Sequence, residues 1–493
     1  MIIAAALLAL FLGAMDALIM SAAMPTIVAD LGGLHLYAWV YSVYFLSRAV
    51  SLPIFAKLAD LYNNKKIFLV SIAVFVTSSV AAGLAPNMMF LIVARVFQGI
   101  GAGGNFALVY IVLADISPPH ERVRTMSFAS SVWGIASVLG PTLGGFIVTF
   151  MSWRWIFFIN VPLGLLSMAG LTFFLVELRE KKKSTSLDLW GVITLSTAIL
   201  GLLTLFLMGG SSHSWLSPRM ALLGAVTITS AAGFYHAERR ARDPILPLEF
   251  FRKRGFSMGN LAVFMSSFSI FALFAFAPVF IQGGLGMSPM QVGVAMLSLS
   301  LGWSAGSLIL GQVSNRLGIK RAAVMGAVLL ISGCFLTVMF SVQTTLAAFF
   351  WVFMLTGLGM GFVTLATLVI VQNSVDVSNL GVATSSNQFA RTLGGTVGVG
   401  ICGGFMNTAL WQARHGLVEQ GVMPAGKGAV LNGNSLDALM QPEFQNLLSE
   451  SARTAFQAAI VSSVSIVFWI VLLAAVACLG FCALLPGKSD IQS

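Results

Sequence analysis

Four charged side chains lie deep inside apolar stretches of this 493-residue chain, which carries 27 Lys/Arg and 17 Asp/Glu in total. They are Asp16, Arg48, Arg95 and Arg391. A charge in an apolar environment is costly, so one that is kept there is expected to have a function or a partner. A buried carboxyl group can gain and lose a proton, and a guanidinium can bind an anion. These four residues therefore point first to proton transfer and ion pairing.

The segments that must position these residues are long and apolar. The chain is 58% hydrophobic and 9% charged, with a mean hydropathy of +0.93. A soluble domain carries about 25% charged residues, so we predict an all-α polytopic membrane protein. The fourteen predicted spans cover residues 2–24, 37–58, 66–85, 88–114, 123–150, 154–176, 188–208, 218–237, 256–284, 288–313, 321–341, 345–371, 380–406 and 455–484.

The basic residues outside the spans predict the orientation, because cytoplasmic loops carry an excess of Lys and Arg. We predict that both termini are cytoplasmic, because most of these basic residues then lie on the cytoplasmic side. They include Lys65–Lys66, Arg122, Arg124, Arg179, Lys181–Lys183, Arg239, Arg240, Arg252–Arg254, Lys320 and Arg321. Because they are spread over many loops, the net charge of +10 does not indicate a nucleic-acid partner. We predict a multi-pass protein of the bacterial cytoplasmic (inner) membrane, in contact with the lipid bilayer.

Enzyme chemistry is not indicated. The sequence has no nucleotide-binding loop, metal-ligand cluster or nucleophile constellation, and its histidines are scattered. The four cysteines, which all fall within predicted spans, are expected to pack as small apolar residues. We expect no cofactor, metal site or disulfide framework.

Two loops resemble each other and suggest an internal repeat. Residues 56–66 follow the second span, and residues 311–321 follow the tenth. Each has a small residue at a helix end, then Asp60 or Asn315, a tight turn and a basic pair. Their recurrence on one side predicts two parallel halves. The predicted units are an N-terminal six-helix half (1–180), two linker helices (181–255) and a C-terminal half (256–493).

The first loop resembles the signature of the major facilitator superfamily. Residues 95–103 resemble its fourth-span motif, and residues 134–145 resemble its fifth-span antiporter motif. Segments typical of the fourteen-span drug:proton antiporter branch are 153–164, 243–248 and 388–395. The resemblance covers most of the chain in the expected order. It implies the major facilitator fold, with two six-helix halves plus two intervening helices, and proton-coupled export.

The antiporter-motif segment has small residues at spacings that suit close helix packing. They are Gly134, Gly140, Gly144 and Gly145, with Pro141 able to bend the helix. Generic membrane-helix packing is the alternative interpretation. The segment 153–164 is interpreted as structural, because an aromatic belt at the membrane boundary explains its tryptophans.

The two repeated loops are implied by the resemblance to form a conformational latch between the halves. Its candidate residues are Asp60, Lys65, Lys66, Asn315 and Arg316. The chain departs from the family pattern here, with Leu61 in place of an Arg and Asn63-Asn64 in place of a Gly-Arg pair. We therefore expect a weaker or rebuilt latch.

Proton coupling is predicted to centre on Asp16, which would change charge as its surroundings alternate between the two sides. The resemblance implies that Arg95 assists the proton transfer, and Arg391 is expected to pair with Asp16 across the halves. Arg48 has no counterpart in the family pattern and is either functional or a structural partner of Asp16. A static ion pair is the alternative role for Asp16 itself.

The deep charges also bear on the substrate. Three are positive and one is negative, and no other span supplies a mid-depth carboxylate, so neutral or anionic amphiphiles are favoured over dications. Candidate residues of the substrate cavity are Arg48, Asn105, Gln282, Gln372, Asn373 and Gln388. The extracytoplasmic loop 409–454 is a linker, a lid or a docking point for a periplasmic adaptor.

The leading hypothesis is a proton-coupled exporter (antiporter) of small amphiphilic drugs or toxic compounds. One alternative is a dedicated exporter of a lipid or an endogenous metabolite. Another is a non-transporting sensor built on a transporter fold, since a fold does not determine a function.

Overall fold

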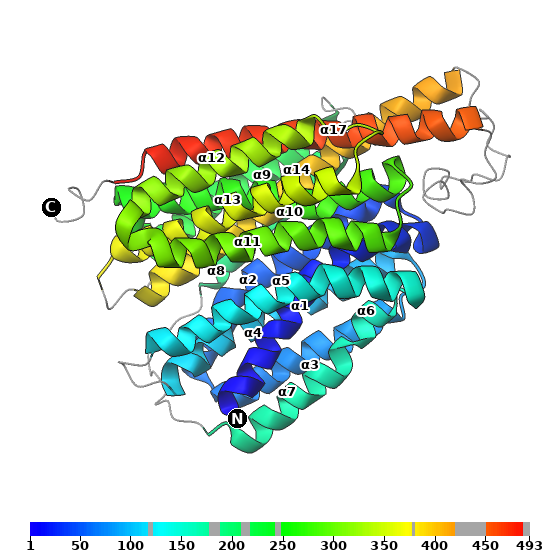
Figure 1. The fold of residues 1–493 in the computed structure, drawn as a ribbon. Coiled ribbons are helices and arrows are strands. Elements are labelled where there is room, and N and C mark those ends of the chain that lie inside the picture. Colours follow the sequence, from blue (N-terminus) through cyan, green and yellow to red (C-terminus); the bar gives the residue numbers. More distant parts are fainter. Residues whose placement is uncertain are drawn as a thin grey trace.

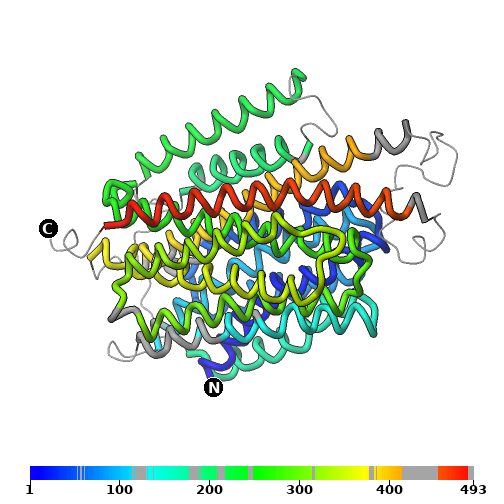
Figure 2. Tube along the Cα trace, turned by 45° about the horizontal axis from the view of Figure 1, so that its top comes forward, coloured from blue at the N-terminus to red at the C-terminus, as the bar shows by residue number. Residues whose placement is uncertain are grey.

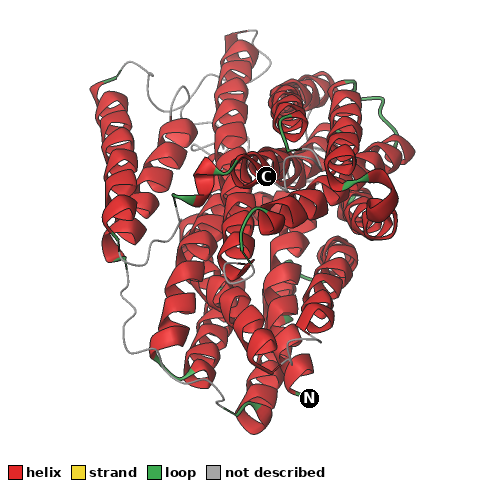
Figure 3. Cartoon of the chain, turned by 90° about the vertical axis from the view of Figure 1, so that its left-hand side faces the viewer, coloured by secondary structure: helices red, strands yellow, loops and turns green. Residues whose placement is uncertain are grey.

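The computed structural model describes residues 1–116, 122–176, 188–208, 217–241, 248–376, 380–419 and 450–486. Within these ranges every regular element is a helix (Figure 3). The N-terminal elements are α1 (Ile2–Leu31), η1 (Leu34–Leu36), α2 (Tyr37–Leu61), α3 (Asn64–Gly83), α4 (Met88–Ile116), α5 (Arg122–Phe150), α6 (Trp155–Phe158) and α7 (Asn160–Phe174).

The remaining elements complete a bundle of membrane-length helices. They are α8 (Leu189–Met208), α9 (Pro218–Arg240), η2 (Phe250–Arg252), α10 (Arg254–Pro278), η3 (Val279–Gly284), α11 (Pro289–Leu317), α12 (Ile319–Val338), α13 (Leu346–Asn373), α14 (Leu380–Glu419) and α17 (Glu450–Ala483). Twelve stretches in the described ranges are long and apolar enough to cross a membrane. With α2 and the shorter apolar α8, they correspond to the fourteen predicted spans.

Several helices begin where a polar side chain caps the first turn. The side-chain Oδ1 of Asn63 accepts a hydrogen bond from the backbone N–H of Lys66 at 2.9 Å, and this caps α3. Ser217 and Thr345 cap α9 and α13 in the same way. Such caps satisfy backbone N–H groups that have no partner inside the helix. They explain why the spans start at these residues.

The helices form two groups that lie side by side (Figure 1). In the first, α1 packs on α4, α5 and α7, and α4 packs on α2 and α3. In the second, α10 packs on α13, α14 and α17, and α13 packs on α11 and α12. The pair α8–α9 contacts the bundle through α8, which lies against α14 and α2. Helix α9 lies at the margin and is mostly exposed, as expected for a lipid-facing helix (Figure 2).

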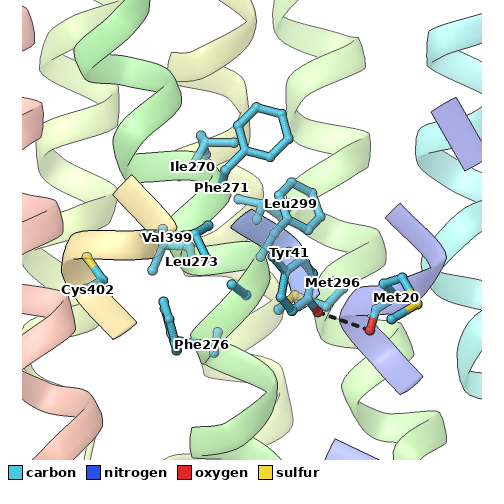
Figure 4. Close-up of a cluster of buried hydrophobic side chains, with 14 of the residues drawn as sticks. Met20, Tyr41, Ile270, Phe271, Leu273, Phe276, Met296, Leu299, Val399 and Cys402 are labelled. Carbon is cyan, nitrogen blue, oxygen red and sulfur yellow. Dashed lines mark hydrogen bonds between the residues drawn. The ribbon is translucent and has the colours of Figure 1, made fainter. Parts of the chain in front are cut away.

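Contacts between the two groups join α5 to α11 and α2 to α14. Figure 4 shows buried apolar side chains from both groups, including Met20 on α1, Tyr41 on α2, Phe276 on α10 and Met296 on α11. The hydroxyl of Tyr41 donates to the carbonyl oxygen of Met20 at 3.1 Å. This packing brings α1 and α2 of the first group against α10 and α11 of the second.

Hydrogen bonds reinforce the same region. The hydroxyl of Tyr37 donates to the carbonyl oxygen of Ala275 on α10. Nε2 of Gln282 lies 3.3 Å from Oγ1 of Thr26, and Nδ2 of Asn407 lies 3.0 Å from the carbonyl oxygen of His35. These three bonds join elements of the N-terminal group to elements of the C-terminal group. The predicted orientation places this end of the bundle on the extracytoplasmic side.

Glycines of the antiporter-motif segment allow α5 to approach two helices at once. A Cβ atom on Gly144 would lie 2.7 Å from the carbonyl oxygen of Ile19 on α1. On the other side, a Cβ atom on Gly145 would lie 3.0 Å from the carbonyl oxygen of Pro289 on α11. Gly134 has more room, because its nearest neighbour would be Oγ of Ser304 at 3.8 Å. The motif therefore places α5 between its own group and the other one.

The predicted outer loop begins later than expected. Helix α14 continues to Glu419, and α17 begins at Glu450, so both ends of the predicted loop 409–454 are helical. The predicted start of the loop at residue 409 is wrong, because a helix can extend beyond the apolar layer and α14 continues through the polar residues after 406. Residues 420–449 lie outside the described part of the chain.

Candidate functional site

Asp16 is fully buried on α1 and is held by side chains from two other helices. Its Oδ2 lies 2.5 Å from Nη1 of Arg95 on α4. Its Oδ1 accepts a hydrogen bond from Nε2 of Gln98 at 2.9 Å and from Nδ2 of Asn160 at 3.3 Å. Arg95 is itself only 1% exposed. Both carboxylate oxygens are therefore paired with protein side chains.

Ser79 on α3 completes this network. Its Oγ lies 3.2 Å from Nε2 of Gln98 and 2.9 Å from Nδ2 of Asn160, and it donates to the carbonyl oxygen of Phe157 at 2.9 Å. Nη1 of Arg95 also donates to Oε1 of Gln98 at 2.9 Å. We call Asp16, Ser79, Arg95, Gln98 and Asn160 the carboxylate site. It joins α1, α3, α4 and α7, which all belong to the N-terminal group.

Tyr44 on α2 supports the arginine of this site. The guanidinium carbon of Arg95 lies 3.9 Å from the centre of the Tyr44 ring, a cation–π distance. The Tyr44 hydroxyl donates to the carbonyl oxygen of Gly13 at 3.2 Å.

Removing one partner of a buried ion pair typically costs about 3–5 kcal/mol, because the other charge is left uncompensated. The carboxylate site thus depends strongly on both Asp16 and Arg95.

Arg48 and Arg391 form a second site, which lies between the two groups of helices. The guanidinium carbon of Arg48 on α2 lies 5.3 Å from the centre of the Trp133 ring system, and that of Arg391 on α14 lies 5.1 Å from it. Arg48 also faces Phe106 at 4.9 Å, and Arg391 faces Trp303 at 5.8 Å. We call these five residues the arginine site.

Charge is poorly compensated in the arginine site. Arg48 is 4% exposed and Arg391 is 9% exposed, and neither has an acidic partner among the described residues. Cation–π contacts contribute about 0.5–2 kcal/mol each, whereas removing a charge from water costs several kcal/mol. Nε of Arg48 and Nε1 of Trp133 are also buried without a hydrogen-bond acceptor. The site therefore has unused donors and positive charge.

The structure separates the predicted charged residues into these two sites. The expected pairing of Asp16 with Arg391 was wrong, because Asp16 is paired with Arg95 and Arg391 lies against two tryptophans. The alternative pairing of Asp16 with Arg48 was also wrong, since Arg48 faces Phe106 and Trp133. Both expectations failed because helix rotation, which depth in a span does not reveal, decides which side chains meet.

The other predicted cavity residues are dispersed. Asn105 accepts a hydrogen bond from Ser71 between α3 and α4, and Gln282 lies near Thr26 at the contact between the two groups described above. Gln372 donates to Thr384 at 2.9 Å, and Asn373 is exposed at the end of α13. Gln388 is half-buried three residues before Arg391, and its Oε1 has no hydrogen-bond partner. Of all six predicted cavity residues, Arg48 belongs to the arginine site, and Gln388 lies on the same helix as Arg391.

The described part of the predicted latch makes contacts within the N-terminal group. Nζ of Lys65 donates to the carbonyl oxygen of Thr172 on α7 at 2.7 Å. Asn63, which departs from the family pattern, caps α3 through the backbone of Lys66. The side chains of Asp60, Asn315 and Arg316 lie outside the described residues.

Sequence reasoning missed the polar partners of Asp16. Asn160 belongs to the segment that the sequence analysis interprets as structural, and the structure adds that it is fully buried and donates to Asp16. Gln98 carried a detectable signal, because it follows Arg95 by three residues and shares its helix face. Trp133 of the arginine site also carried a detectable signal in the sequence, since a tryptophan inside a span is not explained by an aromatic belt at the membrane boundary.

Comparison with known proteins identifies the family. The family model of the Major Facilitator Superfamily matches residues 6–399. Multidrug transporter protein MdtP of Bacillus subtilis is 33% identical over 407 residues, which are 83% of this chain and 75% of that protein. Multidrug resistance protein 3 of Bacillus subtilis is 29% identical over 467 residues, which are 95% of this chain and 91% of that protein.

Solved structures share the fold at low sequence identity. A bacterial homolog of the human lysosomal transporter Spinster, in an inward-facing and occupied conformation, superposes with a TM-score of 0.68 at 14% identity. That alignment covers 97% of this chain and 95% of the other chain. A D-xylose-proton symporter superposes with a TM-score of 0.56 at 15% identity, over 95% of this chain and 96% of the other. With the helix arrangement and the family match, these findings show that the chain belongs to the major facilitator superfamily, a family of transporters rather than enzymes.

Proposed function

We propose that this protein is a proton-coupled exporter of amphiphilic drugs or toxic compounds across the bacterial cytoplasmic membrane. The multidrug transporters of Bacillus subtilis that it resembles over most of its length support drug efflux. The observation that carries proton coupling is the fully buried ion pair between Asp16 and Arg95. Neutral or anionic compounds are the favoured substrates, because Arg48 and Arg391 have no acidic partner in the described residues.

In the proposed cycle, Asp16 exchanges one proton with the side of the membrane to which the transporter is open. Deprotonated Asp16 holds α1 to α4 through Arg95, and protonation removes the charge that attracts this guanidinium. Gln98 and Asn160 keep the carboxyl group in position in both protonation states, because each amide also bonds to Ser79. The change in ion pairing shifts the balance between the two arrangements of the halves.

Replacement of Asp16 by Asn tests the coupling. The purified protein is placed in liposomes with a trapped pH-sensitive dye, a pH gradient is imposed, and substrate-dependent proton flux is recorded. Asp16→Asn is expected to abolish the flux, since an amide of the same shape cannot carry the proton. The matched control is Asp30→Asn on the same helix, which removes a carboxylate that is half exposed and paired with Arg154 at 3.0 Å. Unchanged flux in Asp16→Asn would contradict the proposed coupling.

A further inference from the structure

The arginine site has the features of an anion-recognition site. Two buried guanidiniums face one indole ring from two different helices, and they repel each other electrostatically. Two N–H donors, Nε of Arg48 and Nε1 of Trp133, lack an acceptor. An unpaired buried donor and an uncompensated buried charge are both unfavourable. One bound anion would satisfy both, because its oxygen atoms accept hydrogen bonds and its charge offsets the guanidiniums.

The surroundings of these donors suit an apolar or aromatic body attached to the anion. Phe106, Trp133 and Trp303 come from α4, α5 and α11, so aromatic rings flank the charged groups on both sides of the interface. Trp133 and Trp303 are only half-buried, so the site is not sealed by its own side chains. Rings and charged donors together match an amphiphile that carries a planar or apolar group beside an acid.

The position of the site between the halves also matters. Arg48 and Trp133 belong to the N-terminal group, whereas Arg391 and Trp303 belong to the C-terminal group. A ligand that touches all four would be bound differently whenever the two groups move relative to each other. A ligand with different affinities for the two arrangements shifts their balance, as a transported substrate must.

We propose that Arg48 and Arg391 bind the anionic group of an amphiphilic acid, whose apolar part packs on Trp133 and Trp303. This inference rests on the proposed export function, because it names the class of substrate. It goes further by assigning recognition to a pair of arginines that the proton-coupling scheme does not use. The planar guanidinium can hold a carboxylate, sulfonate or phosphate through two parallel hydrogen bonds.

Equilibrium binding of three probes with one scaffold tests the charge preference. The probes are 4-phenylbutyrate, 4-phenylbutyramide and 4-phenylbutylammonium, which carry a negative, a neutral and a positive group on the same aromatic chain. Binding to the purified protein in phosphatidylcholine nanodiscs is measured by equilibrium dialysis, with empty nanodiscs as the blank. We expect the acid to bind at least about 10-fold more tightly than the amide, which is typical of a charged hydrogen bond. Equal affinities, or a preference for the ammonium probe, would overturn the proposal.

Variants then locate the site. Arg48→Gln and Arg391→Gln should each weaken binding of 4-phenylbutyrate by about 10-fold to 100-fold while leaving the amide probe unchanged. Arg48→Lys should recover part of the loss, because Lys keeps the charge but not the planar fork. The matched control is Arg154→Gln, since Arg154 also lies over a tryptophan, Trp153 at 4.4 Å, but is partly exposed and ion-paired. Loss of binding in this control, or retention in both glutamine variants, would refute the assignment.

Two further experiments distinguish this proposal from the proton-coupling proposal and from lipid binding at the same site. Asp16→Asn should keep at least the wild-type affinity for 4-phenylbutyrate, because binding at equilibrium needs no proton flux. If this variant binds 4-phenylbutyrate normally and its substrate-dependent proton flux is unchanged, the coupling proposal fails and the anion site stands. Phosphatidylglycerol in the nanodiscs tests the source of the anion. Unchanged binding supports a freely diffusing acid, and competition by this lipid would assign the site to a lipid headgroup and overturn the substrate assignment.

Discussion

The carboxylate site and the arginine site are both buried among membrane-spanning helices, but they differ in how their charges are balanced. In the first, one carboxylate meets one guanidinium, and amide and hydroxyl groups bond to the remaining positions. In the second, two guanidiniums face aromatic rings, and the described residues supply no acidic partner. The first balances its charges, although Nε of Arg95 and Oδ1 of Asn160 have no hydrogen-bond partner, whereas the second holds two like charges and has capacity for an anionic ligand.

The sites also differ in their location relative to the two halves. All residues of the carboxylate site belong to the N-terminal group, so its geometry does not require contact with the other half. The arginine site draws residues from both groups. A site inside one half can store a proton, and a site between the halves can register which arrangement they adopt. The comparison suggests that the carboxylate site handles the proton and the arginine site handles the substrate, which the following experiments can test.

The largest expected effect comes from breaking the carboxylate pair. Arg95→Gln should lower the stability of the protein by about 3–5 kcal/mol, because Asp16 is left buried without a counter-charge. The double variant Asp16→Asn/Arg95→Gln should regain much of that stability without regaining transport. Thermal unfolding in detergent compares them, with Arg48→Gln as the reference from the arginine site. We expect Arg48→Gln not to destabilise the protein. An equal loss of stability in Arg95→Gln and Arg48→Gln would contradict the distinction between the two sites.

The second effect concerns membrane potential. If a monoanion leaves while one proton enters, two charges move per cycle, and each contributes about 2.3 kcal/mol per 100 mV. An inside-negative potassium diffusion potential should therefore accelerate export of 4-phenylbutyrate more than export of the neutral amide. Transport in proteoliposomes with valinomycin measures this difference. Identical responses to potential would indicate that the acid moves in its neutral form, without help from the arginine site.

The third effect separates the two faces of α5. Gly144→Ala should destabilise the N-terminal half by about 1–3 kcal/mol, because the new methyl group meets the carbonyl oxygen of Ile19 on α1. Gly145→Ala, whose methyl group faces α11, should instead slow transport more than it lowers the unfolding temperature. Gly134→Ala, with its larger space, is the control. Equal effects of Gly144→Ala and Gly145→Ala on the transport rate and on the unfolding temperature would contradict the proposed difference between the two faces of α5.

The smallest effect is expected at Lys65. Its bond to the carbonyl oxygen of Thr172 lies within the N-terminal group, near the surface, so Lys65→Met should change stability by less than about 1 kcal/mol. Transport rates should stay within a factor of about 5, since a shift of 1 kcal/mol corresponds to about fivefold. A transport defect much larger than this would restore Lys65 to the predicted latch between the halves.

The amino-acid sequence alone determined the membrane-spanning character and the number and location of the spans. It could do so because crossing the bilayer requires a run of about 20 apolar residues, which is a local property of the chain. The same reasoning found the four deep charges, since each stands out against its own apolar surroundings. The ends of α3, α4 and α12 agree with the predicted spans to within about three residues, whereas α1 continues past the predicted end at residue 24 to Leu31.

Only the tertiary structure decided which charges meet. Asp16 pairs with Arg95, 79 positions away, and accepts a hydrogen bond from Asn160, 144 positions away, while Arg48 and Arg391 converge on Trp133. These contacts depend on how far each helix is rotated and on which helices are neighbours. Those two quantities come from packing of small residues such as Gly144 against a neighbouring backbone, and no local run of sequence specifies them.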